Sequence, residues 1–310
     1  MPVAKSKALS LKIRGYLLAC AVLLLVIGGW HLATLPKKVY APTDPAKLEY
    51  SVLMGDIPEG TPLGGVVAQQ ASEFVSPQKF ADIAVYHLSD PFYDKGINDK
   101  GIGIQLGFSI VRVLLGFILA MMVAIPLGYL IGISPILRQA FMPFVQLLKP
   151  ISPLAWMPIA LYTIKDANAS SVFVIFICSI WPMLTNTAFG VMSVNQSWKN
   201  VAKTLELSPL ATATKIVLPA AAPTIVTGMR ISMGIAWLVI VAAEMLVGST
   251  GIGYFVWNQW NNLSLGDVIF AVLVIGVVGM VLDLLFAWLQ NKVSYVAVSY
   301  THLTLPTSDL

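Results

Sequence analysis

The sequence predicts an all-α membrane protein with six transmembrane helices, cytoplasmic N- and C-termini and one long extracytoplasmic loop. Of its 310 residues, 57% are hydrophobic and only 11% are charged, and the mean hydropathy is +0.80. A soluble domain carries about 25% charged residues, so this chain has too few charges to cover a soluble core. Its apolar residues also come in blocks of about 20, the length that crosses the hydrocarbon layer as a helix.

The first predicted span, 15–35, follows a basic segment, 1–14, that we expect in the cytoplasm. This segment contains four Lys and Arg residues and no acid. A basic stretch before an apolar run is also typical of a secretory signal peptide. The run is long and lacks a small-x-small cleavage site at its end, which favours an uncleaved helix.

The segment 36–103 differs from the rest of the chain. It contains many prolines and glycines, and it has nine acids against six lysines. It lacks an apolar run long enough to span a membrane. We therefore expect an extracytoplasmic, water-facing segment with short helices, because loops of this length are usually functional or disordered.

Five further spans form a predicted core, 104–290. The expected spans cover 104–133, 140–164, 170–193, 223–247 and 267–290. The span 140–164 is interrupted by Lys149, Pro150 and Pro153, which predicts a broken helix. Such a break is tolerated at membrane depth where it faces protein or water. Gly128 and Gly132 form a small-xxx-small pair that is typical of helix packing.

The distribution of positive charge sets the expected orientation. Lys and Arg concentrate in short cytoplasmic loops, so we attribute the net charge of +4 to basic residues kept on the cytoplasmic side of a membrane, and we expect lipid and not nucleic acid as a partner. With the N-terminus inside, the outer side receives the acid-rich segment 36–103. The inner side then receives the basic residues of 1–14 together with Arg138, Lys199, Lys203, Lys215 and Lys292.

The tail, 291–310, does not continue this pattern. A basic flank is expected after the last span, but the residues from Ser299 to Leu310 resemble a translated sequencing adaptor. We expect the native tail to be missing from about residue 296, and we assign this part no function.

Motifs for catalysis are absent from the sequence. It contains no GxxxxGK[ST], HExxH, CxxC or GxSxG, so neither a nucleotide-phosphate loop nor a common hydrolase site is predicted. Its three histidines are too scattered to bind a metal together. Gly101-Ile-Gly103 and Gly251-Ile-Gly253 are typical of turns before a helix or strand. Active transport would therefore draw its energy from an ion gradient or from another subunit.

The loop 194–222 is polar, basic and compatible with helix. We expect a helix from Trp198 to Leu207, a turn at Ser208-Pro209 and a second helix over 209–217 that ends at Leu218-Pro219. Val201, Leu205 and Leu210 would form an apolar ridge that enters a groove in a partner. The alternative is an amphipathic loop that lies on the membrane surface.

This loop resembles the signature of permease subunits of binding-protein-dependent ABC importers: Glu-Ala-Ala, three residues, Gly, nine residues, Ile-x-Leu-Pro. The residues that match are Ala202, Ile216, Leu218 and Pro219. The residues that depart are Asn200 for Glu, Val201 for the first Ala and Glu206 for Gly. The resemblance implies that partner ATPase subunits dock on Asn200, Val201, Ala202, Lys203, Thr204, Leu205, Glu206, Leu207, Ser208 and Pro209.

Residues 90–290 are similar to the permease of nitrate ABC importers. The similarity includes the segments that begin at Gly101, Pro150 and Ala236. It implies a multi-pass protein of the bacterial cytoplasmic (inner) membrane, with six helices of the importer-permease type. It also implies a second permease subunit that makes a homodimer, and an extracytoplasmic anion-binding protein. ATP and Mg would bind to the cytoplasmic ATPase subunits and no cofactor to this chain. The implied substrate is nitrate or nitrite. The alternatives are bicarbonate, cyanate, taurine or alkanesulfonate, an ion-driven secondary transporter, or a non-transporting scaffold or receptor.

Several charged and aromatic residues inside the spans, and one serine at the proline break, are candidates for an anion path. They are Arg112, Lys149, Ser152, Trp156, Arg230 and Trp237, with Trp181 as a further tryptophan. The alternatives are snorkelling for the cations and anchoring or packing for the tryptophans. Glu244 and Asp283 are predicted structural charge partners, with Asp283 pairing with Arg112 or Arg230. Helical periodicity places Arg230, Gly234, Trp237, Val241 and Glu244 on one face, which we expect to turn inward.

Overall fold

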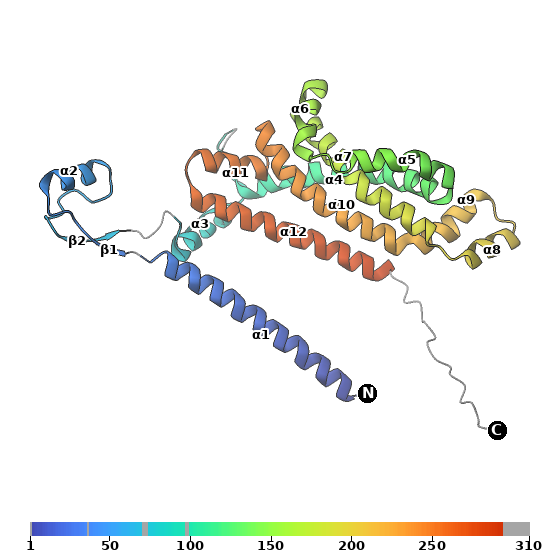
Figure 1. The fold of residues 1–310 in the computed structure, drawn as a ribbon, viewed down its shortest axis with the longest axis horizontal. Helices are drawn as coiled ribbons and strands as arrows, with labels where there is room; N and C mark the ends of the chain where they lie inside the picture. Colours follow the sequence, from blue (N-terminus) through green and yellow to red (C-terminus); the bar gives the residue numbers. More distant parts are fainter. Residues whose placement is uncertain (1, 36, 70–73, 97–98, 294–310) are drawn as a thin grey trace. The chain divides into compact units, whose positions relative to one another are not determined.

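A computed structural model of the chain describes residues 2–35, 37–69, 74–96 and 99–293 (Figure 1). The chain divides into two compact units, 1–90 with 259–270, and 91–258 with 271–310. The predicted non-native tail, from about residue 296, lies outside the described residues. The structure is mostly helical, which confirms the predicted fold class.

The first unit combines an apolar helix with a small folded segment. α1 (Pro2–Ala33) precedes β1 (Lys37–Tyr40), α2 (Pro45–Leu53), β2 (Val66–Gln69) and α3 (Pro77–Ser89). β1 and β2 pair antiparallel, with Tyr40 opposite Val66. The short helices agree with the expectation for 36–103, and the strand pair adds to it. The indole of Trp30 donates a hydrogen bond to the Val75 carbonyl (2.8 Å) and so attaches the end of α1 to the chain before α3.

A partly buried polar contact joins α3 to the start of α12 (Leu265–Val293) within the same unit. His87 Nε2 lies 2.7 Å from Asp267 Oδ1, and the imidazole stacks on the Phe270 ring. Ser264 donates a further hydrogen bond to the Asp267 carboxylate. Residues 259–270 therefore belong with the first unit although they lie far from it in sequence.

Three long helices form the core of the second unit. α4 (Ile102–Ile133) and α10 (Leu218–Val247) each pack along α7 (Ala167–Met192). Glycines allow this close approach: a Cβ on Gly128 would lie 2.8 Å from the Leu184 carbonyl oxygen, and a Cβ on Gly132 would lie 2.7 Å from Val191 Cβ. The predicted packing role of this glycine pair is confirmed.

The predicted broken span is present. α5 (Pro135–Leu148) and α6 (Pro153–Ile164) meet at a bend of 94°. Pro153 follows Ser152, whose ψ of 134° is non-helical, because the residue before a proline avoids the α region. Among the described residues, five helices are long and apolar enough to cross a membrane, and the bent pair makes a sixth.

The predicted end of the second loop helix at Leu218-Pro219 is wrong. α8 (Gln196–Thr204) is separate, but α9 (Pro209–Thr212) continues through the π-helical turn η1 (Ala213–Val217) into α10. Pro219 has no N–H to donate. The wider π turn accommodates it, because the Leu218 N–H donates a hydrogen bond to the Ala213 carbonyl and the helix continues. The resulting 39-residue helix, 209–247, is about 58 Å long at 1.5 Å per residue. It is roughly twice as long as the hydrocarbon layer is thick.

Candidate functional site

The first helix of the 194–222 loop ends at Thr204 and not at the predicted Leu207, and its capped end is centred on Glu206, whereas Ser208-Pro209, the predicted turn, begins the next helix. Glu206 N–H donates to Lys203 O (3.0 Å) and Leu207 N–H donates to Ala202 O (3.1 Å), the two hydrogen bonds of a Schellman motif. Glu206 has a φ of +50°, which glycine adopts without steric cost. It stands at the signature position that glycine occupies, so the departure from the signature preserves the backbone conformation.

The loop then turns into the long helix. Ser208 Oγ accepts a hydrogen bond from Ala211 N–H (3.3 Å), and Pro209 is the first helical residue. Ala202 is buried at 2% exposure, on the inner face of α8. The exposed face of the loop carries large apolar side chains, each more than half exposed: Trp198, Val201 and Leu205 in or directly after α8, and Leu210 in α9.

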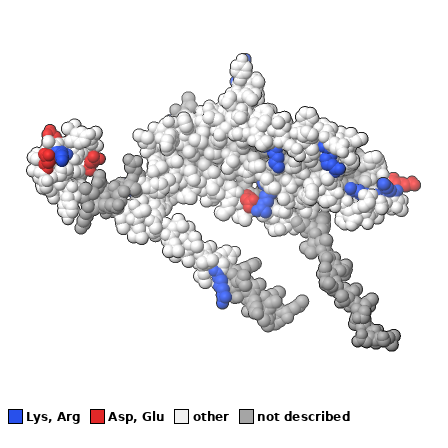
Figure 2. All heavy atoms as spheres, viewed as in Figure 1, with Lys and Arg blue, Asp and Glu red and all other residues white. Residues whose placement is uncertain are grey.

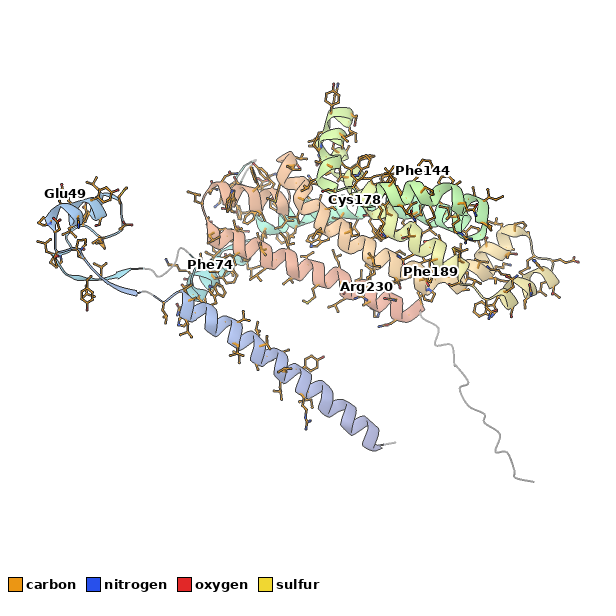
Figure 3. The ribbon with its side chains drawn as sticks, in the orientation of Figure 1. Glu49, Phe74, Phe144, Cys178, Phe189 and Arg230 are labelled. Carbon is orange, nitrogen blue, oxygen red and sulfur yellow. The ribbon has the colours of Figure 1, made fainter. Side chains whose placement is uncertain are left out.

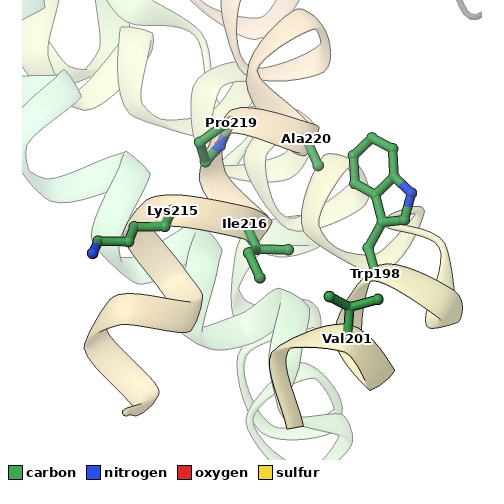
Figure 4. A pocket seen from close by; sticks show the side chains of 6 residues that line it. All are labelled: Trp198, Val201, Lys215, Ile216, Pro219 and Ala220. Carbon is green, nitrogen blue, oxygen red and sulfur yellow. The ribbon is translucent and has the colours of Figure 1, made fainter. Parts of the chain in front are cut away.

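A shallow apolar pocket of about 410 Å³ lies beside this exposed face (Figure 4). Trp198 and Val201 of α8 line one side, and Ile216 points toward them from η1, whereas Lys215 points away. Lys and Arg side chains gather at this end of the unit in Figure 2. The segment 194–222 carries three lysines and one acid, so the exposed surface is apolar with a positive surround.

A buried ion pair lies at the other end of α10. Arg112 Nη1 donates to Glu244 Oε1 (2.7 Å) and to the Thr250 carbonyl (2.6 Å). Its Nε and Nη2 donate to Asn168 Oδ1 at 3.0 and 2.6 Å. Glu244 is 0% exposed and also accepts from Ser109 Oγ and the Gly253 N–H. The guanidinium predicted for the anion path is therefore occupied by protein acceptors.

The glycine pair 251 and 253 fits closely around this ion pair. A Cβ on Gly251 would overlap the Glu244 carboxyl group, and one on Gly253 would overlap the Val241 carbonyl. Gly251 N–H donates to Gln105 Oε1 (2.6 Å), and α11 (Ile252–Asn261) begins at the next residue. The pair is thus a turn before a helix, as predicted. Gly101, in the other predicted turn, is the N-cap of α4.

A second ion pair joins α10 to α12. Arg230 donates to both carboxylate oxygens of Asp283, from Nε and Nη2, each at 2.6 Å, so Asp283 pairs with Arg230 and not with Arg112. Arg230 is labelled on α10 in Figure 3. Trp237 is buried, and its indole donates to the Ile275 carbonyl (3.0 Å). Gly234 is exposed, so the predicted inward face is only partly inward.

The remaining predicted path residues surround one cavity of about 250 Å³ at the break between α5 and α6. Lys149, Ser152 and Trp156 line it from the broken span, and Trp181 lines it from α7. Arg112, Arg230 and Trp237 do not line it. The cavity is completed by Pro150, Ile151, Pro153, Cys178, Pro182 and Ile235.

Residues 113–295 match the family described as "binding-protein-dependent transport system inner membrane component", which is more than half of the chain. The chain belongs to this family. It is an inner membrane component of a transport system, with several apolar helices long enough to span the membrane. The predicted family resemblance and inner-membrane location are confirmed.

This transport component is similar to curated cyanobacterial permeases. It is 43% identical to the nitrate import permease NrtB of Synechocystis over 72% of this chain and 82% of that protein. It is 42% identical to NrtB of Synechococcus elongatus over 68% and 77%. It is 44% identical to the bicarbonate transport permease CmpB of Synechocystis over 67% and 74%.

A solved structure of the MetNI methionine ABC transporter in an inward-facing conformation shares the fold. The TM-score is 0.55 at 12% sequence identity, covering 61% of this chain and 94% of that chain. At this identity the match concerns architecture alone.

The sequence analysis of this transport component missed Gln105 and Ser109 of the buried network. Their spacing with Arg112, i, i+4 and i+7 on one helix face, was a usable signal.

Proposed function

We propose that this chain is the transmembrane permease subunit of an ATP-driven, binding-protein-dependent importer of nitrate or nitrite. The observation that carries this proposal is the 43% identity to a nitrate import permease across 72% of the chain. Bicarbonate is the second candidate, because the bicarbonate permease CmpB is 44% identical over 67% of the chain. The family's description favours a binding-protein-dependent system over an ion-driven carrier or a scaffold.

The proposed division of labour gives each step to a different subunit. An extracytoplasmic protein captures the anion, and two copies of this chain form the path. Two cytoplasmic ATPase subunits bind ATP and Mg and hydrolyse ATP, so this chain itself is not an enzyme. In this arrangement the N-terminus, the loop 194–222 and the C-terminus lie in the cytoplasm, and residues 36–103 lie outside.

The loop 194–222 is the proposed ATPase-docking element. Its exposed ridge of Trp198, Val201, Leu205 and Leu210 would enter a groove of the ATPase as a short amphipathic helix does. Ala202 faces inward, and the Schellman cap at Glu206 fixes where α8 ends. Because α9 continues into α10 without interruption, a displacement of the loop would reach the spans as a rigid-body motion.

The test reconstitutes this chain with its ATPase and binding proteins in liposomes. ATP hydrolysis is measured with nitrate, nitrite, bicarbonate and taurine in turn, for the wild type and for Leu205→Asp. We expect stimulation by nitrate, and at least a tenfold loss of ATPase co-purification for Leu205→Asp, because a buried charge at a docking ridge leaves an unpaired group in the interface. Leu53→Asp is the control, since Leu53 is also an exposed leucine but lies in α2.

The outcomes separate the parts of the proposal. Stimulation by bicarbonate and not by nitrate would assign the chain to the bicarbonate importers. Normal co-purification of Leu205→Asp would remove the ridge from the ATPase contact. Failure of every anion to stimulate, with no ATPase bound, would refute the importer.

A further inference from the structure

We propose that the cavity between the break of α5–α6 and the centre of α7 is a transient binding site for a small inorganic oxyanion during its passage. The inference rests on the proposed import function and adds a location and a set of ligands. The observation behind this proposal is that one cavity of about 250 Å³ is lined by Lys149, Ser152 and Trp156 together with Trp181.

The lining of the cavity offers donors to an anion. The Lys149 ammonium has three N–H donors and no acceptor, and each indole has one N–H and no acceptor. The Ser152 hydroxyl makes no side-chain cap hydrogen bond to α6, although Ser152 is the residue before that helix. Among the described residues that line the cavity, none is acidic. The site therefore favours a negative charge and disfavours a cation.

The cavity lies at mid-depth of the helix bundle. Trp181 is about 21 Å from the start of α7 and about 17 Å from its end, counted at 1.5 Å per residue. Cys178, labelled on α7 in Figure 3, lines the same cavity one turn earlier. From α10, Ile235 contributes about 26 Å from the start of that helix and about 18 Å from its end, counted in the same way. A discontinuous helix at this depth is a common place for substrate sites in transporters.

The volume limits what the cavity holds. At about 30 Å³ per water, a volume of 250 Å³ accommodates an oxyanion with a partial hydration shell. Lys149, Ser152 and the two indoles would replace the waters that are lost. A single, solvent-accessible lysine gives a weak site, and a conducting path needs binding that is weak enough for release.

The experiment measures nitrate uptake and binding-protein-stimulated ATP hydrolysis of the reconstituted importer in parallel. We expect Lys149→Met to lower uptake at least about tenfold, because it removes the one positive charge facing the anion, while ATP hydrolysis stays within twofold. Lys149→Arg keeps the charge and should retain more than half of the uptake. Lys165→Met is the matched control, because Lys165 lies at the opposite end of α6 and outside the cavity.

Two further variants test the polar donors. Trp181→Phe keeps an aromatic ring and removes the N–H, and Ser152→Ala removes the hydroxyl. Each should lower uptake per ATP hydrolysed by about two- to fivefold, the effect of one neutral hydrogen bond. A purely structural role would lower uptake and hydrolysis together.

The site is refuted if Lys149→Met leaves uptake unchanged, or if uptake and ATP hydrolysis fall in proportion. If the wild-type complex imports bicarbonate and not nitrate, the proposed substrate fails, but the ratio measured with bicarbonate still decides the site. If the wild type imports no anion, the importer and the site both fail.

Discussion

Neutralising Glu244 tests the buried ion pair most directly. We expect Glu244→Gln to destabilise the protein, although glutamine has nearly the same shape. Every hydrogen-bond partner of the carboxylate is a donor: Arg112 Nη1, Ser109 Oγ and the Gly253 N–H. One oxygen becomes an NH2 group in the variant, so at least one donor faces another donor, and Arg112 remains charged with no counter-ion.

The magnitude follows from burial. Glu244 is 0% exposed and Arg112 is 5% exposed, so water screens neither group. Removing one partner of a buried ion pair costs about 3–5 kcal/mol. Gln keeps one acceptor for Arg112 or Ser109, so we take about 3 kcal/mol, which corresponds to a fall of roughly 6–12 °C in the melting temperature of a chain of this size.

The assay is thermal unfolding of the purified protein in detergent, with Glu206→Gln as the control. Glu206 is exposed, so its neutralisation should shift the melting temperature by less than about 2 °C. The double variant Arg112→Met with Glu244→Gln should be more stable than the sum of the single changes predicts, because no unpaired charge remains.

A melting temperature of Glu244→Gln within 2 °C of the wild type would contradict this reasoning, since roughly 6 °C is the least that the loss implies. Additive single and double variants would contradict it as well, because they would show that the two charges do not interact. Either result would mean that the ion pair contributes little to holding the ends of α4 and α10 together.

Three other changes have expected outcomes. Gly128→Ala should lower the melting temperature because its Cβ would lie 2.8 Å from the Leu184 carbonyl oxygen. In Gly107→Ala, on the same helix, the new Cβ meets nothing within 4 Å. This second variant should raise the melting temperature slightly, because alanine stabilises a helix by about 0.5–1 kcal/mol relative to glycine. Glu206→Gly should stabilise the protein by about 1 kcal/mol, because it relieves a left-handed conformation, and the melting temperature in detergent measures the gain. Asp283→Asn should lower the melting temperature in detergent because Arg230 loses both of its hydrogen bonds to the carboxylate, and Arg230→Gln in the same chain should recover most of that fall.

Much of the fold was predictable because hydrocarbon imposes a length. Apolar runs of about 20 residues must be helices, and prolines 150 and 153 located the break between α5 and α6. The error at Pro219 has a physical cause. A proline is expected to end a helix, but a π turn provides another way to accommodate the missing N–H, and nothing local in the sequence indicated which outcome would occur.

The candidate site was predictable by residue type but not by location. Charged residues inside spans are few, so Arg112, Lys149 and Arg230 were identifiable. Sequence could not tell which of them has protein partners. Arg112 meets acceptors from α7 and from the 248–251 turn, contacts that depend on tertiary packing. Lys149 lies at the break and lines the cavity, and this position is the reason that we propose it as a path residue.

Leu210 of the docking ridge, Ile235 of the cavity wall and Glu244 of the buried ion pair lie along the same helix, 209–247. This arrangement leads to a last prediction. Counting from Glu244, which is fixed by its buried network, Leu210 of the docking ridge is about 51 Å away along the 209–247 helix and Leu238 is about 9 Å away, at 1.5 Å per residue. If ATP-driven docking tilts this helix about its fixed end, a displacement at Leu210 should be five to six times that at Leu238. Both side chains are more than 70% exposed, so spin labels there, each paired with one at Leu115 of α4, can measure it with and without ATP. Equal displacements would mean that the helix slides as a unit, and movement confined to Leu210 would mean that it bends at η1. Either result would contradict a pivot at Glu244.

A tilt about Glu244 would also move the cavity wall at Ile235, by about a quarter of the displacement at the ridge. A shift of about 5 Å at the loop would therefore move this wall by little more than 1 Å. A change of that size is enough to alter contacts with a small anion, because hydrogen bonds weaken over a few tenths of an ångström.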